Sequence, residues 1–165
     1  MPSEPTVFVD TNVLIYAVNL DTAHHDASRR WLDAALSGAD RVGFAWVVLL
    51  AFVRLTTRTG LFPTPLLVSD ATSQVEDWLS SPSAVVVEPT LRHAAVLSDL
   101  LSEVGTGGNL VTDAHLAALA REHRADIVTY DRDFTRYPGV RSATPDTLLM
   151  PGPRRGRPRG SSAPS

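Results

Sequence analysis

Residues 109–134, with the sequence NLVTDAHLAALAREHRADIVTYDRDF, predict a helix followed by a strand, with carboxylates at both ends of the pair. Asp113 stands at the start of an alanine- and leucine-rich segment typical of a helix. The β-branched run 127–129 predicts a strand, and Asp131 and Asp133 follow it. Short acidic residues are common at helix caps and in turns, so these positions have a purely structural explanation. The alternative is a metal site, which requires acids from other parts of the chain.

Segments typical of strands alternate with segments typical of helices along most of the chain. Strands are predicted at residues 7–9, 41–45, 84–87, 127–129 and 140–143. Helices are predicted to begin near residue 13 and to cover residues 23–36, 46–58, 66–79, 90–104 and 113–123. This alternation predicts an α/β fold with a central, mostly parallel sheet of four to five strands and helices on both faces. A single domain at residues 1–146 is expected.

The helix predicted at residues 46–58 has apolar side chains at helical spacing. Trp46, Leu49, Leu50 and Val53 stand at positions i, i+3, i+4 and i+7. This spacing places four side chains on one side of a helix. We therefore expect these four residues to form its buried face.

Acids from separate segments are expected to meet at one edge of the predicted sheet. In parallel sheets, ligands bind beyond the carboxyl ends of the strands. Asp10 follows the first predicted strand, whereas Asp131 and Asp133 follow the fourth. If these strands are neighbours, Asp10 and Asp131 share that edge. The helix that Asp113 begins must run antiparallel to the strand it precedes, so Asp113 lies there too. Three or four carboxylates are thus expected to converge.

Converging carboxylates favour a bound cation, because they otherwise raise each other's pKa. The chain has no cysteine, so a metal must be held by oxygen or imidazole. The five histidines show no metal-ligand spacing, and we expect surface or structural roles for them. Mg²⁺ or Mn²⁺ is held by carboxylates, water and phosphate oxygens, and it activates bound water. The pattern therefore suits metal-assisted hydrolysis of a phosphodiester, with caps and turns as the structural alternative.

Charge is unevenly distributed along the chain. The net charge is −3, and residues 1–150 carry −7 once the four arginines of residues 151–165 are set apart. The segment 147–165 is rich in Arg, Pro, Gly and Ser, and we expect it to be a disordered tail. Its arginines have a second interpretation as contacts to RNA phosphates. No apolar run reaches the length of a membrane span and no signal peptide begins the chain, so a cytoplasmic location is expected.

Three motifs resemble those of the PIN-domain ribonucleases. They are VDTNVLIY at residues 9–16, GNLVTDA at 108–114 and TYDRDF at 129–134. The likeness covers roughly residues 6–145, and it is greatest to the VapC-type toxins of bacterial toxin–antitoxin systems, especially the mycobacterial ones. The order and spacing of three separate motifs make the resemblance fairly specific.

The resemblance implies a Mg²⁺- or Mn²⁺-dependent endoribonuclease that acts on structured RNA such as tRNA or rRNA. It further implies neutralisation by a small VapB-like antitoxin, and a homodimer. The residues that match the metal-binding acids are Asp10, Asp113 and Asp131, and Asp133 matches a further catalytic acid. The residues that are candidates for substrate binding are Thr11, Asn12, Asn109, Thr129 and Arg54. For Arg54, a solvated or ion-paired side chain is the alternative.

The chain departs from the family pattern at Ala51, where a glutamate is common. An alanine side chain can neither bind a metal nor orient water. This substitution keeps a second hypothesis open, a catalytically weak or inactive binding module of the same fold. Two other enzyme classes, aspartate-nucleophile phosphatases and phospho-accepting receiver domains, are disfavoured because the chain has no lysine.

Overall fold

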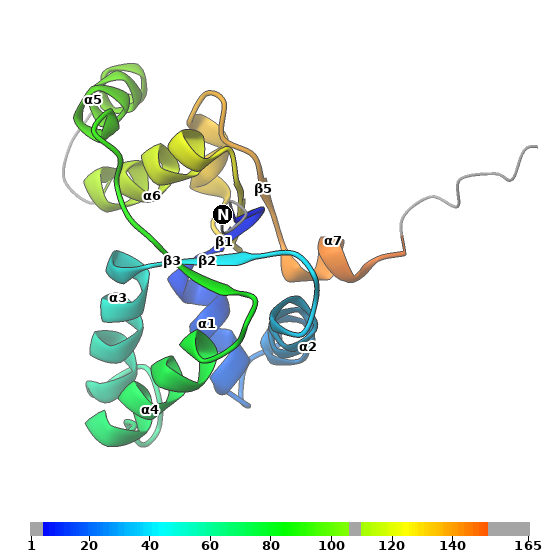
Figure 1. The fold of residues 1–165 in the computed structure, drawn as a ribbon. Helices are drawn as coiled ribbons and strands as arrows, with labels where there is room; N and C mark the ends of the chain where they lie inside the picture. Colours follow the sequence, from blue (N-terminus) through cyan, green and yellow to red (C-terminus); the bar gives the residue numbers. More distant parts are fainter. Residues whose placement is uncertain (1–4, 106–109, 152–165) are drawn as a thin grey trace, which may run out of the picture.

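Within the described residues, five parallel strands form the centre of the molecule in the order β3-β2-β1-β4-β5 (Figure 1). The computed structural model describes residues 5–105 and 110–151, so Asn109 and the tail from residue 152 lie outside the described residues. The strands are β1 (Val7–Val9), β2 (Val42–Ala45), β3 (Ala84–Val87), β4 (Asp126–Val128) and β5 (Ser142–Ala143). The predicted α/β fold is confirmed.

Strand β1 lies between β2 and β4, which is the arrangement that the convergence of the acids requires. Phe8 is in register with Ile127, and Val9 with Val128. The backbone N–H of Asp10 continues this ladder by donating to the carbonyl of Val128 at 3.0 Å. The chain therefore leaves β1 and β4 at the same edge of the sheet.

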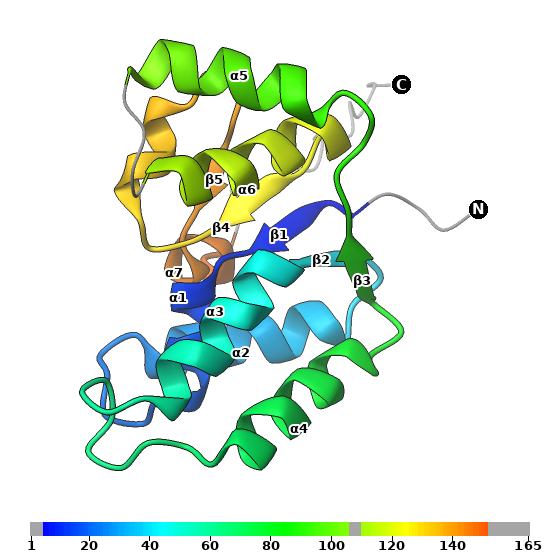
Figure 2. The same cartoon turned by 90° about the vertical axis from the view of Figure 1, so that its left-hand side faces the viewer.

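Helices cover both faces of the sheet. Figures 1 and 2 show α5 and α6 on one side and α1 to α4 on the other. The helices are α1 (Thr11–Val18), α2 (His25–Leu36), α3 (Trp46–Thr57), α4 (Val68–Leu79), α5 (His93–Val104), α6 (Leu110–His123), α7 (Pro145–Leu149) and the short 3₁₀ helix η1 (Arg132–Arg136). No helix among these described residues has both the length and the apolar character needed to span a bilayer.

The buried face of α3 differs from the one expected from its spacing. Trp46 is 48% exposed and Leu50 is 62% exposed, whereas Val48, Leu49 and Phe52 are buried. The prediction was wrong for Trp46 and Leu50 because the segment is apolar at almost every position from 46 to 53, so its helical period is weak. The contacts of α3 with α1 and α4 select the face instead.

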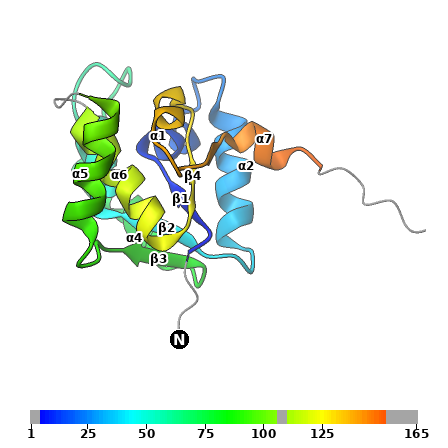
Figure 3. The ribbon, with the colours of Figure 1, turned by 90° about the horizontal axis from the view of Figure 1, so that it is seen from above.

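Helix α7 lies beside α2, as Figure 3 shows from above. The hydroxyl of Thr144 caps this helix by accepting a hydrogen bond from the backbone N–H of Thr147 at 3.2 Å. Pro145, at the first helical position, is buried. The expected end of the domain at residue 146 falls inside this helix, and the described chain continues as helix to Leu149.

Gly43 in β2 is required by the close packing of β1 and β3 on either side. A Cβ at this position would overlap the ring of Phe8 and the side chain of Val87. Phe8 and Val87 are both buried in the core. The absence of a side chain at residue 43 therefore lets Phe8 fill the centre of the sheet face.

Candidate active site

Asp10 follows β1 directly and caps the first helix. As the N-cap of α1, it accepts at Oδ1 a hydrogen bond from the backbone N–H of Thr11, the first helical residue, at 2.8 Å. Its Oδ2 accepts from the hydroxyl of Thr129 at 2.8 Å and from the side-chain amide of Asn12 at 3.3 Å. Burial raises the pKa of Asp10, the hydrogen bonds from Thr129 and Thr11 oppose this, and the charge of Asp131 adds to it. Asp10 is thus both a helix cap and a restrained, half-buried carboxylate.

Thr129 is the centre of the hydrogen bonds that join the ends of β1 and β4. It is only 3% exposed. Its hydroxyl donates to Asp10, accepts from the amide of Asn12 at 3.0 Å, and accepts from the backbone N–H of Asp131 at 2.9 Å. Asn12 completes the connection by accepting the backbone N–H of Tyr130 at 3.1 Å. These two side chains, predicted to bind substrate, contact the acids directly.

Asp131 and Asp133 begin the 3₁₀ helix η1 after β4. The carboxylate of Asp131 accepts the backbone N–H of Asp133 at 2.9 Å, so Asp131 is the N-cap of η1. The carboxylate of Asp133 is half exposed and lies 3.4 Å from the guanidinium of Arg136. Both acids serve as helix-terminal residues, as their sequence positions suggest, and both also act electrostatically on Asp113.

Asp113 lies in the first turn of α6. The start of α6 is held near η1 by the buried Tyr137, whose hydroxyl donates to the carbonyl of Leu110 at 3.2 Å. Burial raises the pKa of Asp113 to about 6, and the charges of Asp131, Asp10 and Asp133 contribute in that order. The four acids from three segments therefore affect one another, as expected from their positions in the sequence.

A cavity of about 280 Å³ between α1, α3 and α6 contains Asp10, Asn12 and Asp113. Ala51 lines the same cavity, so a longer side chain at this position would face the acids. Its apolar wall includes Val47 and Leu55, which flank Ala51 at intervals of four residues on α3. This wall was not among the sequence predictions, although residues 47, 51 and 55 form a second apolar stripe at helical spacing.

The remaining candidates are placed differently. The hydroxyl of Thr11 donates to the backbone carbonyl of Val48 at 3.3 Å, which joins α1 to α3 beside the cavity. Arg54 is exposed on the last turn of α3 and does not line the cavity. The prediction for Asn109 concerns a residue outside the described ranges. Among the described residues, Asp10, Asp113, Thr11 and Asn12 thus line one cavity, whereas Asp131 and Asp133 act on Asp113 only through their charge and Arg54 lies apart.

Two histidines and a glutamate join α5 to α6 on the side away from the cavity. Nδ1 of His93 lies 2.5 Å from the buried carboxylate of Glu122, and Nε2 of His93 lies 2.8 Å from Nδ1 of His115. The hydroxyl of Thr90 also donates to Glu122. This cluster fixes α5 against the helix that carries Asp113. Structural roles, as expected for the histidines, fit His93 and His115.

Comparison with known proteins assigns this arrangement to a family. The model of the PIN domain matches residues 7–140. The chain is 66% identical over 141 residues to Ribonuclease VapC37 of Mycobacterium tuberculosis, which covers 86% of this chain and 98% of the relative. The chain is a PIN-domain protein of the VapC family. Ribonuclease VapC25 of Mycobacterium tuberculosis is a more distant VapC relative, 36% identical over 83% of this chain and 96% of its own length.

Solved structures have the same fold as this VapC protein. VapC20 of Mycobacterium tuberculosis, described as a sarcin-ricin loop cleaving toxin, superposes with a TM-score of 0.61 at 21% identity. It covers 82% of this chain and 99% of the other. VapBC2 from Rickettsia felis, bound to a DNA fragment from its promoter, gives 0.63 at 19% identity over 84% and 98% of the two chains. At these identities the likeness concerns the fold alone.

The acids of this VapC protein have the ligand chemistry of a hard divalent cation. Among the described residues, no three carboxylates or imidazoles are grouped closely enough to enclose a metal ion by themselves. Mg²⁺ does not require this, because it is usually held by one or two carboxylates, several waters and substrate phosphates. Asp10 and Asp113 in one cavity, with Asp131 nearby, supply such a donor set. The residues present therefore fit a Mg²⁺ or Mn²⁺ ion.

The raised pKa of Asp113 predicts a pH-dependent stability of the metal-free VapC protein. The unfolded value is about 3.9, and the folded value is about 6. The contribution of Asp113 to stability is fully present below about pH 4 and is lost as the pH rises through about 6, because the folded state then carries a partly buried charge that the neighbouring acids also repel. Asp113→Asn should therefore melt at a higher temperature than the wild type in EDTA at about pH 7.5, and at nearly the same temperature at about pH 4.

Differential scanning fluorimetry measures these melting temperatures. Asp77→Asn, at an exposed position on α4, is the matched control and should follow the wild type at both pH values. Mn²⁺ should raise the melting temperature of the wild type more than that of Asp113→Asn, because binding to the folded state stabilises it. Equal shifts in the two proteins would mean that Asp113 acts only as a residue of the helix terminus.

Proposed function

We propose that this protein is a Mg²⁺- or Mn²⁺-dependent endoribonuclease that hydrolyses phosphodiester bonds in structured RNA such as tRNA or rRNA. The observation that carries the proposal is the single cavity that contains Asp10 and Asp113, with Asp131 and Asp133 close enough to raise the pKa of Asp113. The ribonuclease names of the relatives at 66% and 36% identity support the same reaction.

In this proposal, Asp10, Asp113 and Asp131 hold the metal. When bound, the metal supplies a water of lowered pKa and neutralises negative charge on the phosphoryl group. Thr129 and Asn12 keep Asp10 in place through their hydrogen bonds. In the hydrolysis, the oxygen of a water would bond to phosphorus, one P–O ester bond would break, and the departing ester oxygen would take up a proton. Asp133, whose side chain is half exposed beside Arg136, would carry the proton from the water to the departing oxygen.

Partners are part of the same proposal. Complexes described as VapBC share the fold of this chain, and a small VapB-like antitoxin is the expected inhibitor. Trp46 and Leu50, four residues apart on α3, present exposed apolar side chains that suit contact with an antitoxin or with a second copy in a homodimer. Substrate and inhibitor would meet the protein in the cytoplasm. Arg54, exposed on the same helix, is available for RNA phosphate.

The test of this function is cleavage of total tRNA by the purified full-length protein, with Mn²⁺ in one reaction and EDTA in the other. Cleavage in Mn²⁺ alone is expected, and gel electrophoresis measures it. If no RNA, rRNA included, is cleaved with any divalent metal, the protein is a binding module and the enzyme proposal fails.

Ala51→Glu is expected to strengthen metal binding and to accelerate cleavage. The new carboxylate would enter the cavity that contains Asp10 and Asp113, where hard divalent cations gain from additional anionic ligands. The concentration of Mn²⁺ that gives half-maximal cleavage should fall about tenfold, which corresponds to about 1.4 kcal/mol. Ala51→Gln, of similar size and without the charge, is the control. An unchanged Mn²⁺ requirement in Ala51→Glu would show that position 51 does not reach the metal.

A further inference from the structure

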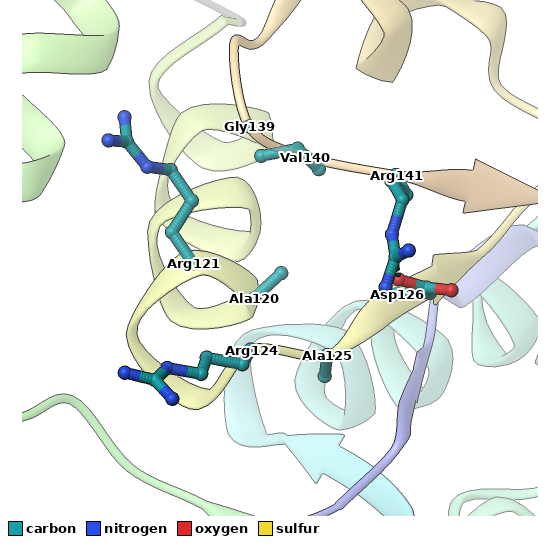
Figure 4. Close-up of a pocket in the computed structure, with 8 residues that line it drawn as sticks. All are labelled: Ala120, Arg121, Arg124, Ala125, Asp126, Gly139, Val140 and Arg141. Carbon is teal, nitrogen blue, oxygen red and sulfur yellow. Dashed lines mark hydrogen bonds and ion pairs between the residues drawn. The ribbon is translucent and has the colours of Figure 1, made fainter.

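A second pocket, of about 480 Å³, lies at the far end of α6 from Asp113. Its charged residues are Arg121, Arg124, Arg141 and Asp126, and its small apolar residues include Ala120 and Ala125. We call it the arginine pocket. Figure 4 shows Arg121 and Arg124 extending from the end of α6, with Arg141 on the opposite side next to Asp126. The pocket is assembled from α6, from the N-terminal residue of β4 and from the segment that leads into β5.

Two of the three guanidinium groups are not neutralised by the protein. Arg141 donates to the carboxylate of Asp126 at 2.9 Å. Among the residues that the structure describes, Arg121 and Arg124 make neither an ion pair nor a side-chain hydrogen bond. In a body that carries −7 over residues 1–150, this pocket is a local concentration of positive charge. An anion is the ligand that such a pocket selects.

Backbone hydrogen bonds, and not the side chain of Arg124, terminate helix α6. The N–H of Ala125 donates to the carbonyl of Ala120 at 2.9 Å, and the N–H of Arg124 donates to that of Arg121 at 3.3 Å. These two bonds form the Schellman motif at the end of α6. Arg124 occupies its left-handed position, with φ 55°, where glycine is the usual residue. A cation is favourable at a helix C-terminus, but this position accepts glycine with less strain.

Gly139 shapes the opposite wall of the pocket. It has φ 74°, and a Cβ there would lie 3.6 Å from Nε of Arg121. The backbone of the segment 139–141 therefore approaches the stem of Arg121 closely. Arg121 is half-buried as a result, so part of its side chain is already ordered before a ligand binds. Ordering in advance lowers the entropic cost of binding.

We propose that Arg121 and Arg124, whose guanidinium groups point outward at the rim of the arginine pocket (Figure 4), each bind a phosphate group of the RNA strand away from the bond that is cleaved. The proposal rests on the ribonuclease function proposed above. Arg121 is eight residues from Asp113 along α6, which is about 12 Å of helix axis, and Arg124 is about 16 Å from it. A strand held at the acids and at the pocket would follow α6. Guanidinium groups recognise phosphate oxygens through paired hydrogen bonds, and such contacts position a nucleic acid without reading its sequence.

The double substitution Arg121→Ala with Arg124→Gly tests this binding site. Alanine favours the helix at position 121, and glycine fits the left-handed backbone at 124, so the variant should fold. Fluorescence anisotropy with labelled tRNA in EDTA measures binding without cleavage. The affinity should fall several-fold. The negative slope of log K against log salt should become shallower by about 0.7 for each phosphate of a single strand that no longer binds an arginine.

The matched control is Arg29→Ala with Arg30→Ala, which removes the same charge from the exposed face of α2. This control should retain the affinity and salt slope of the wild type within a factor of about two, since surface charges far from a ligand are screened. If the two double variants lose the same affinity for tRNA, the loss reflects net charge alone and the proposal is overturned. If the variant Arg121→Ala with Arg124→Gly binds RNA normally but binds the antitoxin more weakly, the pocket belongs to a protein partner. This result would also overturn the proposal.

Failure of the pocket and failure of the enzyme proposal give different results. If the pocket variant binds tRNA like the wild type while the wild type cleaves RNA, only the pocket inference fails. If the wild type binds tRNA through the pocket but never cleaves RNA, only the enzyme proposal fails. If the wild type does not bind tRNA at all, the pocket inference is overturned.

Discussion

Asp10→Asn is expected to reduce RNA cleavage by about 1,000-fold, because it removes a carboxylate from the proposed metal site. Charge stabilisation by a bound metal is worth several kcal/mol, and each 1.36 kcal/mol corresponds to a factor of about ten in rate. The amide of asparagine would also oppose the hydroxyl of Thr129 and the amide of Asn12, both of which now donate to Oδ2. Single-turnover cleavage of total tRNA at saturating Mn²⁺ measures the loss.

Folding must be separated from catalysis in this experiment. Asp10→Asn keeps an oxygen for the backbone N–H of Thr11, so the cap of α1 is preserved and the melting temperature in EDTA should change little. Removing the charge also relieves the repulsion between Asp10 and Asp131. A folded Asp10→Asn protein that cleaves RNA at the wild-type rate would show that Asp10 is only a helix cap.

The convergence of the acids follows from the order of strands and helices, and this order could be predicted from the sequence. Alternating strands and helices implied a parallel sheet, and each acid stood just beyond a strand or at the start of a helix. Only the adjacency of β1 and β4 had to be assumed, and their register confirms it. An aspartate directly after a strand is informative, because its position along the chain determines the edge of the sheet on which it lies.

Features that depend on packing between distant segments were harder to predict. The exposed face of α3 is set by contacts with α1 and α4, and an almost uniformly apolar segment does not encode that choice. The arginine pocket joins residues on α6 to residues after η1, and Arg124 stands where a glycine would have marked the end of the helix. Thr129 was predicted as a substrate-binding residue, but its hydrogen bonds to Asp10, Asn12 and Asp131 require the paired ends of β1 and β4.

Thr129→Val is expected to reduce cleavage by about 10- to 100-fold, the range found when residues that support metal ligands are replaced. Valine has nearly the shape of threonine but cannot donate to Asp10 or accept from Asn12 and Asp131. The carboxylate of Asp10 would lose a restraint, and the apparent affinity for Mn²⁺ should fall. Unpaired buried polar groups should lower the free energy of unfolding by about 1–3 kcal/mol as well.

The Mn²⁺ dependence of cleavage distinguishes a positioning role for Thr129 from a structural one. Loss of stability alone would lower the amount of active protein but leave the Mn²⁺ concentration for half-maximal cleavage unchanged. A weakened orientation of Asp10 would raise that concentration. Thr129→Ser, which keeps the hydroxyl and removes only a methyl group, should restore the wild-type Mn²⁺ requirement even if it lowers stability slightly. The same Mn²⁺ requirement in Thr129→Val and the wild type would exclude Thr129 as a residue that positions the acid.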